Sequence, residues 1–195
     1  MSSPSITRRI VIISGPSGAG KSTVVRQLLA TCPVPILHSV SATTRTPRPG
    51  EVDGVHYHFL SREAFAQRRE AGEFLECKEV FGRGDWYGTL ESEIKGGLAA
   101  GKWMVLEIDV EGAMSILQRF PNAITIFVHV GSIEELERRL RERGTENEAA
   151  LARRMEVARR ELDSKAKYRH EVVNHNVDQA VDDICNILRS YASLP

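Results

Sequence analysis

Eight residues near the N-terminus, 15–22 with the sequence GPSGAGKS, restrict the choice of fold more than any other part of the chain. They follow a β-branched run, residues 10–13, that is typical of a strand buried on both faces. They lead into a segment, about 21–30, that is expected to be a helix. A glycine-rich turn between a buried strand and a helix N-terminus directs consecutive backbone N–H groups toward one point, where they can surround a phosphate group.

The octapeptide matches the pattern G-x-x-x-x-G-K-[ST] at every fixed position, and it lies in the required strand-to-helix context. It therefore predicts a site for ATP or GTP. Lys21 is expected to reach the β and γ phosphates, and the Ser22 hydroxyl is expected to ligate the accompanying Mg²⁺ ion. The alternative is a turn that caps the helix and binds nothing, but the complete match in this context favours a phosphate site. The predicted phosphate loop consists of Gly15, Pro16, Ser17, Gly18, Ala19, Gly20, Lys21 and Ser22.

Three later runs repeat the strand pattern, and a helical segment follows each one. Alternation of strands and helices predicts an α/β fold, with a parallel sheet and helices packed on it. The stretch 36–90 differs, because it is rich in Thr, Pro and Gly at 41–54, alternates at 55–59 and is helical at 62–71. It predicts an inserted, partly antiparallel subdomain. The three runs are residues 103–108, 123–128 and 171–174.

Two capping boxes occur in the C-terminal third of the chain, one at Ser132 with Glu135 and one at Thr145 with Glu148. In such a box a hydroxyl and a glutamate three residues later satisfy amides that the first helical turn leaves free. The boxes predict two consecutive charged helices with a hinge at Gly144.

The composition limits the class of protein. A chain of 195 residues has the length of one domain. Its 26 Lys and Arg residues balance 26 Asp and Glu residues, so no overall positive field favours nucleic acid, and an anion must be bound locally. No run approaches the roughly 18 apolar residues of a membrane span. The three scattered cysteines predict neither a disulfide framework nor a zinc site. We expect a cytoplasmic protein without nucleic-acid or membrane partners.

Two arginines stand three residues apart in the Thr- and Pro-rich stretch. Pro47 and Pro49 keep the chain around Arg45 and Arg48 extended, because proline fixes its own φ and restricts the residue before it. Two guanidinium groups held in this way can bind a phosphate through a fork of hydrogen bonds. A surface loop with solvated arginines is the alternative, and this stretch alone leaves both possibilities open.

Seven short motifs follow one another along the chain: GPSGAGKST at 15–23, SATTRTPRPGE at 41–51, YHF at 57–59, GEFLE at 72–76, YGT at 87–89, IDVEG at 108–112 and RGT at 143–145. In this order they resemble the motifs of the guanylate kinase family. The resemblance implies ATP-dependent phosphorylation of GMP to GDP with Mg²⁺, in a single domain with a P-loop NTPase-type fold. It implies three parts: a core at about 6–38, 91–131 and 168–195, a mixed α/β GMP-binding part at about 39–90, and a helical lid at about 132–167.

The resemblance also implies roles for individual residues. Thr23 and Asn174 match positions that bind ATP together with the phosphate loop. Positions that hold the GMP phosphate match Arg45, Arg48, Tyr57 and Tyr87. Positions that read the guanine base match Ser41, Glu76, Thr89 and Asp109. Positions that act on the transferring phosphoryl group match Lys21, Arg45 and three lid arginines, Arg139, Arg143 and Arg154.

The base-reading assignment is chemically consistent. Guanine presents N1–H and N2–H₂ as adjacent donors, which one carboxylate accepts as a pair, whereas adenine presents an acceptor at N1. Taken without the motif series, Glu76 has the pattern of a solvated acid at a helix end. Asp109 stands at the C-terminal end of a predicted central strand, where open α/β sheets bind ligands, so it is a candidate independently of the resemblance.

Two of the predicted lid arginines, Arg139 and Arg143, are four residues apart, so they share one face of a helix. Arg154 begins the return helix. The resemblance implies that these side chains close on the phosphates and exclude water. The alternative is a solvated helix whose arginines pair with nearby glutamates, and this is what we expect of Arg138 and Arg141.

Two other functions are weighed against an active guanylate kinase. A related P-loop phosphotransferase for another monophosphate is expected to lack the pair Glu76 and Asp109. A non-catalytic, guanylate-kinase-like protein-interaction module is expected to lack an intact phosphate loop. Both features are present, so we predict an active enzyme. Glu107 stands where the family often has Asp and has no assigned role, and the connection from Glu76 to Tyr87 is longer than is usual in the family.

Overall fold

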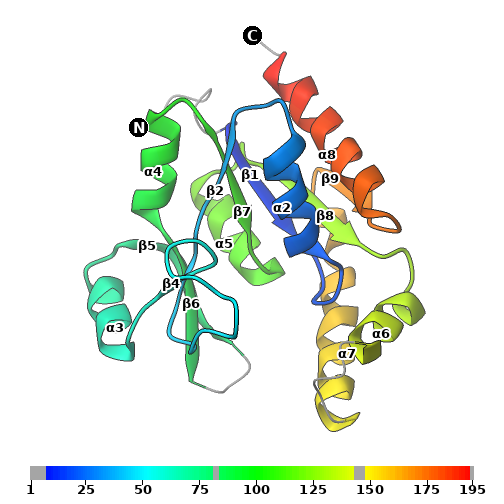
Figure 1. The fold of residues 1–195 in the computed structure, drawn as a ribbon, viewed down its shortest axis with the longest axis horizontal. Coiled ribbons are helices and arrows are strands. Elements are labelled where there is room, and N and C mark those ends of the chain that lie inside the picture. The colour runs from blue at the N-terminus through cyan, green and yellow to red at the C-terminus, as the bar shows by residue number, and fades with distance from the viewer. Residues whose placement is uncertain (1–7, 81–83, 143–147, 194–195) are drawn as a thin grey trace.

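The computed structural model describes residues 8–80, 84–142 and 148–193. Its centre is a five-stranded sheet with the order β2-β7-β1-β8-β9, in which every neighbouring pair is parallel (Figure 1). The predicted α/β fold with a parallel sheet is therefore confirmed. The edge strand β2, which directly follows Pro35, is an addition to the prediction. The strands are β1 (Ile10–Ser14), β2 (Ile36–His38), β7 (Trp103–Glu107), β8 (Ile124–His129) and β9 (His170–Val173).

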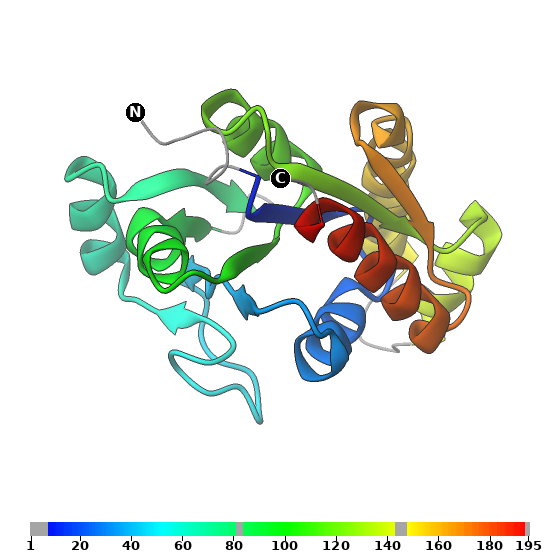
Figure 2. The ribbon, with the colours of Figure 1, turned by 90° about the horizontal axis from the view of Figure 1, so that it is seen from above.

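Helices cover both faces of this sheet, and the side chains of β1 show why its sequence is apolar throughout. Val11 and Ile13 pack into one apolar cluster with residues of α2 and α8. Ile10 and Ile12 point the other way, into a cluster with residues of α4 and α5. Figure 2 shows α2 and α8 together on one face and α5 on the opposite face. These helices are α2 (Lys21–Thr31), α4 (Glu91–Ala99), α5 (Val110–Arg119) and α8 (Val177–Ala192).

A second, four-stranded sheet with the order β4-β3-β6-β5 forms the inserted region. It is mixed, because β3 pairs with β4 in parallel, whereas β6 pairs with β3 and with β5 in antiparallel fashion. Its apolar core is small and includes Phe65 of α3 stacked on Phe74 of β5. The mixed character of this region is as predicted. Its elements are β3 (Ala42–Thr43), β4 (His58–Phe59), α3 (Arg62–Glu70), β5 (Phe74–Val80) and β6 (Asp85–Leu90).

One local prediction in this region is wrong. The alternating stretch 55–59 is a strand only at His58–Phe59, because residues 54–56 form a turn in which Gly54 adopts φ 72 and the His56 amide donates to Val52 O. Glu76, which by itself has the pattern of a helix-end acid, lies in strand β5. A charged edge strand lacks the apolar alternation by which strands are recognised.

Two consecutive charged helices, α6 (Ile133–Glu142) and α7 (Glu148–Leu162), follow β8 as predicted. Contrary to expectation, Arg154 does not begin the second helix but lies in its interior. The Ser132 hydroxyl accepts from the Glu135 amide at 3.1 Å, so the first capping box supplies its expected N-cap bond. The second box and the hinge at Gly144 lie wholly or partly outside the described residues. An apolar cluster joins both helices to the phosphate loop through Ala19, Leu136 and Met155, among others. Among the helices that the structure describes, none is long and apolar enough to cross a membrane.

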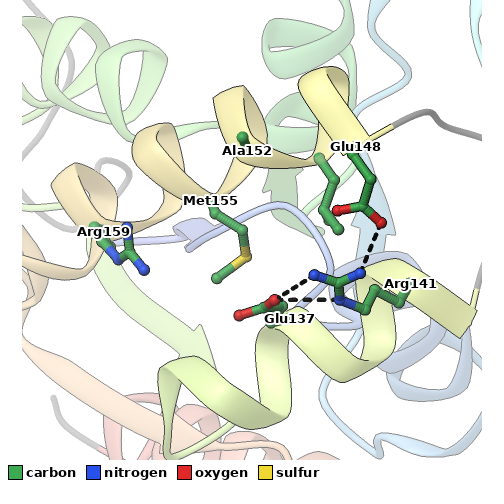
Figure 3. Close-up of a pocket in the computed structure, with 7 residues that line it drawn as sticks. Glu137, Arg141, Glu148, Ala152, Met155 and Arg159 are labelled. Carbon is green, nitrogen blue, oxygen red and sulfur yellow. Dashed lines mark hydrogen bonds and ion pairs between the residues drawn. The ribbon is translucent and has the colours of Figure 1, made fainter.

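A small pocket of about 210 Å³ lies between α6 and α7 (Figure 3). Arg141 points between Glu137 of its own helix and Glu148 of α7, and it contacts each carboxylate at 2.8 Å. Arg138 pairs with Glu135 at 2.8 Å. These are the solvated ion pairs that the sequence predicts for Arg138 and Arg141. The pocket contains no residue of the phosphate loop, and a larger cavity elsewhere does.

Candidate active site

The phosphate loop connects the end of β1 to the start of α2 at the C-terminal edge of the parallel sheet. Gly15, Gly18 and Gly20 adopt φ angles of 138°, 93° and 83°, which only glycine adopts readily. The Lys21 Nζ lies over the loop and donates to the backbone oxygens of Gly15 at 2.6 Å and Pro16 at 3.0 Å. The loop therefore has the curled backbone and the nearby ammonium group that bind a polyphosphate.

Replacing Gly15 with alanine is expected to lower the free energy of unfolding by about 2 kcal/mol or more. A Cβ at this position would lie 2.0 Å from the backbone oxygen of Val128, an atom of a central strand that has little freedom to move. Urea unfolding measures the change. Gly96→Ala is the matched control, because a Cβ there meets nothing within 4 Å. It is expected to change the unfolding free energy by no more than about 1 kcal/mol, and equal losses in both variants would contradict the prediction.

Side chains from distant parts of the chain contact the phosphate loop. The Asn174 amide, which is buried after β9, donates to Ala19 O at 2.8 Å. Arg139 of α6 donates to Asn174 O at 3.0 Å and pairs with Glu135 at 2.7 Å. Arg154 of α7 donates to the Ser17 hydroxyl at 2.6 Å. The structure thus brings Asn174, Arg139 and Arg154 to the loop, and Arg143 lies outside the described residues.

Ser22, at the start of α2, donates from its hydroxyl to the Glu107 carboxylate at 2.6 Å. Glu107 ends β7, the strand next to β1, so the sheet itself brings the two side chains together. A hydroxyl and one carboxylate suit Mg²⁺, which usually takes few protein oxygens and completes its shell with waters and substrate phosphates. No cluster of three or more acidic, His or Cys side chains with metal-site geometry occurs within the described ranges.

A second cluster of polar side chains lies on the mixed sheet. Arg45 donates to the Tyr87 hydroxyl at 3.1 Å, and its Nη2 contacts both carboxylate oxygens of Glu51, at 2.8 and 2.9 Å. Its guanidinium also lies 5.6 Å from the ring centre of Tyr57, and burial raises the pKa of this tyrosine to about 12. The hydrogen bonds from Arg45 hold the pKa of Glu51 below its usual value. Arg48 is exposed and reaches this cluster through its backbone amide, which donates to Glu51 at 2.7 Å.

Two carboxylates, those of Glu76 and Asp109, line the same cavity as the tyrosines of this cluster. Glu76 accepts from the Thr89 hydroxyl at 2.7 Å across the β5–β6 pair. Burial, together with the nearby Asp109 carboxylate, raises the pKa of Glu76, although the bond from Thr89 acts in the opposite direction. Asp109 caps α5 by accepting from the Gly112 amide at 2.8 Å. Glu76 and Asp109 both approach Gly112, where a Cβ would be 3.3 Å from an oxygen of each.

One cavity of about 690 Å³ joins the phosphate loop to the second cluster. Figure 1 shows the mixed sheet and α7 on opposite sides of the edge of the core where the loop lies. Of the predicted site residues, the cavity is lined by Gly15, Ser17, Lys21, Ser41, Tyr57, Glu76, Tyr87, Asp109 and Arg154. Thr89 and Arg45 contact members of this set, and Thr23 lies in the first turn of α2.

Several charged residues that the sequence analysis missed also line the cavity, and two of them, Lys78 on β5 and Glu161 on α7, have shifted pKa values. Burial raises the pKa of Glu161, while the ammonium of Lys21 and the backbone amide of Ser17 act to lower it. In the part of the chain that the structure describes, its Oε2 atom is buried without a hydrogen-bond partner. Both residues occur within charged segments, and only the three-dimensional arrangement distinguishes them from solvated neighbours.

A phosphate loop at the C-terminal edge of a parallel sheet, opening into a cavity with a second polar cluster, defines the class of P-loop phosphotransferases. The model of the guanylate kinase family matches residues 7–191. The chain therefore belongs to the guanylate kinase family, and it is an enzyme of the nucleoside monophosphate kinase type.

Individual relatives agree with this assignment. A guanylate kinase of Rhodopirellula baltica is 58% identical over 181 residues, which are 92% of this chain and 87% of the relative. One from Desulfitobacterium hafniense is 44% identical over 179 residues, 92% of this chain and 88% of the relative. The crystal structure of guanylate kinase from Anaplasma phagocytophilum superposes with a TM-score of 0.77 at 32% identity and covers 95% of this chain and 86% of its own.

Proposed function

We propose that the protein transfers the γ-phosphoryl group of ATP to GMP, giving ADP and GDP, with Mg²⁺ as the cofactor. The observation that carries this proposal is the shared cavity, in which Lys21 of the phosphate loop and the pair Glu76 and Asp109 line different parts of one space. The relatives named guanylate kinase support the same reaction. The size of the cavity, about 690 Å³, falls within the usual range of small-molecule sites.

The reaction requires positioning more than proton transfer. A phosphate oxygen of GMP attacks the γ-phosphorus of ATP, and the bond from that phosphorus to the β,γ-bridging oxygen breaks, leaving its electron pair on ADP. The attacking oxygen is already ionised at neutral pH, so no general base is needed. The protein must instead bring two polyanions into line and offset the charge on the phosphoryl group that moves.

Cationic side chains around the loop are proposed to provide this charge. Lys21 binds the β and γ phosphates, and Arg154, already in contact with Ser17, approaches from α7. Arg139 approaches from α6, where it contacts Asn174. Ser22, supported by Glu107, would hold Mg²⁺, which when bound neutralises phosphate oxygens as a Lewis acid. Arg143 is proposed to join the lid arginines on the basis of the motif series alone.

The second cluster is proposed to bind GMP. Arg45, Tyr57 and Tyr87 hold its phosphate, with Arg48 contributing from the exposed end of the loop. Glu76 accepts from N1–H and N2–H₂ of guanine, and Asp109 accepts from N2–H₂. Ser41 and Thr89 complete the contacts to the base. We further propose that the three parts expected from the sequence act as core, GMP-binding part and lid, with the lid at about 132–167 excluding water.

A coupled assay of ADP formation with ATP and Mg²⁺ tests this function. GMP, AMP, CMP and UMP are compared as acceptors at equal concentration, and a reaction without acceptor gives the rate of ATP hydrolysis. We expect turnover with GMP at least about 100-fold above the other three, because a buried polar site left unpaired by the wrong base discriminates strongly. Similar rates with several acceptors would favour a related phosphotransferase, and no rate with any acceptor would favour a non-catalytic module.

A further inference from the structure

Lys78 lies in the part of the cavity that is proposed to read the base, although no motif points to it. On strand β5 it is two residues from Glu76, so both side chains emerge on the same face of the strand. On the neighbouring strand β6, Lys78 is paired with Tyr87 and Glu76 with Thr89. All of Glu76, Lys78 and Tyr87 line the cavity. The strand register therefore places an ammonium group directly beside the predicted base-reading carboxylate.

The ammonium of Lys78 is held by two carboxylates of another element. It contacts Asp109 Oδ2 and lies 2.9 Å from Glu111 Oε2, both at the start of α5. Burial lowers the pKa of Lys78, but these contacts outweigh burial and raise its pKa above the ordinary value. The Lys78 and Asp109 side chains are 29% and 33% exposed, so this pair is partly shielded from solvent, whereas Glu111 is 82% exposed.

These contacts fix the orientation of Asp109. Its Oδ1 accepts from the Gly112 amide at 2.8 Å, and its Oδ2 is engaged by Lys78, so each carboxylate oxygen has one protein partner. An ionised carboxylate offers about four lone-pair sites, so each oxygen keeps a site for a further donor. The ammonium also offsets the repulsion between Asp109 and Glu76, which both approach Gly112.

We infer that Lys78 is a positioning residue for recognition of the base: it holds Asp109 so that its carboxylate accepts from the exocyclic N2 amino group of guanine. The inference rests on the proposed function, in which GMP is the acceptor. Lys78 is not part of any of the seven motifs. It lies on the mixed sheet, whereas Asp109 belongs to the core. The same contact therefore ties the two parts of the base site together.

The test compares Lys78→Met with the wild type, using GMP as substrate and IMP as a competing ligand. IMP lacks the N2 amino group and keeps the rest of the purine edge, so it has nothing to donate to Asp109. We expect the KM for GMP to rise about tenfold, as for the loss of one charge-assisted hydrogen bond, with kcat within about twofold of wild type. The inhibition constant of IMP is expected to stay within about twofold, and Lys78→Arg to restore part of the GMP affinity.

Two further variants make the test specific. Lys95→Met is the matched control, because this lysine of α4 is 72% exposed and pairs only with a neighbouring turn of its own helix among the described contacts. In an Asp109→Asn background, Lys78→Met is expected to change the KM for GMP by less than about twofold, since the residue it positions has lost its charge. This cycle keeps the inference testable if either single variant is less stable.

Several outcomes would overturn the inference. An unchanged KM for GMP would show that Lys78 does not position Asp109. Equal losses for GMP and IMP would show a general structural role, and a lower KM would show that Lys78 competes with the base for the carboxylate. Failure of the proposed function is distinguishable, because the wild-type protein would then not phosphorylate GMP.

Discussion

Lys21→Ala is expected to reduce kcat for phosphorylation of GMP by about 1,000-fold, with a folded protein. The ammonium lies 2.6 and 3.0 Å from two backbone oxygens of the phosphate loop, at the wall of the cavity where the β and γ phosphates are proposed to bind. It would neutralise charge that grows on the β,γ-bridging oxygen as the bond breaks. Removal of one preorganised charge-stabilising donor typically lowers the rate by about 100- to 1,000-fold. Because Lys21 carries a full positive charge, we expect a loss at the upper end of this range.

Coupled assays at saturating ATP and GMP measure this loss, and single-turnover experiments separate chemistry from product release. Lys95→Ala, on the exposed face of α4, is the control for the general effect of removing a lysine. Thermal unfolding of both variants checks the fold, and we expect midpoints near that of the wild type. A Lys21→Ala enzyme with a nearly normal kcat would contradict the assignment of the ATP site.

Glu76→Gln is expected to raise the KM for GMP by about 100-fold or more and to leave the KM for ATP within about twofold. Guanine offers two adjacent donors, and the glutamine amide offers one acceptor and one donor, so one donor would face another in a partly buried site. Thr89 can still donate to the remaining oxygen, so the β5–β6 contact at 2.7 Å has a replacement. The loss should therefore be confined to the acceptor nucleotide.

The fold should tolerate this substitution. Burial raises the pKa of Glu76 above its value in the unfolded chain, so the folded protein binds this proton more tightly than the unfolded chain does. The ionised carboxylate consequently opposes folding at neutral pH, and stability from this group increases as the pH falls through the raised pKa. A neutral glutamine removes that opposition. Calorimetric titration with GMP and with ATP measures the two affinities, and Glu73→Gln, in the turn before β5, is the control. Equal weakening of both nucleotides would contradict a base-reading role.

The phosphate loop and the core could be predicted from the sequence because their signals are local. The glycines, Lys21 and Ser22 lie within one short segment. Strand β1 is recognised by its unbroken apolar run, which is needed because helices pack on both faces of the sheet. The mixed sheet gave weaker signals, because its strands are short or charged. Strand β4 has two residues, and β5 carries Glu76 and Lys78 at the edge of its sheet.

Contacts between distant elements could not be predicted in the same way. Ser22 and Glu107 are 85 residues apart, and their contact exists because β1 and β7 are neighbours in the sheet. Glu161 follows two arginines on α7, a segment whose pattern is that of a solvated helix, and it reaches the phosphate loop only through the packing of that helix. The resemblance to the family identified residues such as Asn174 as candidates, but the residues that they contact are known only from the three-dimensional structure.

Helix α6 packs directly on the phosphate loop, and this has a thermodynamic consequence. A Cβ at Gly18 would lie 2.9 Å from Leu140 and 3.1 Å from Leu136, and Ala19 is buried in the same apolar cluster. The loop and the helix thus share one interface. Any ligand that shifts the loop backbone also changes the free energy with which α6 packs on the loop. Because coupling between two sites is reciprocal, a shift of α6 changes the free energy of ligand binding by the same amount. The leucines of α6 therefore influence the affinity of the nucleotide site, although they do not line its cavity.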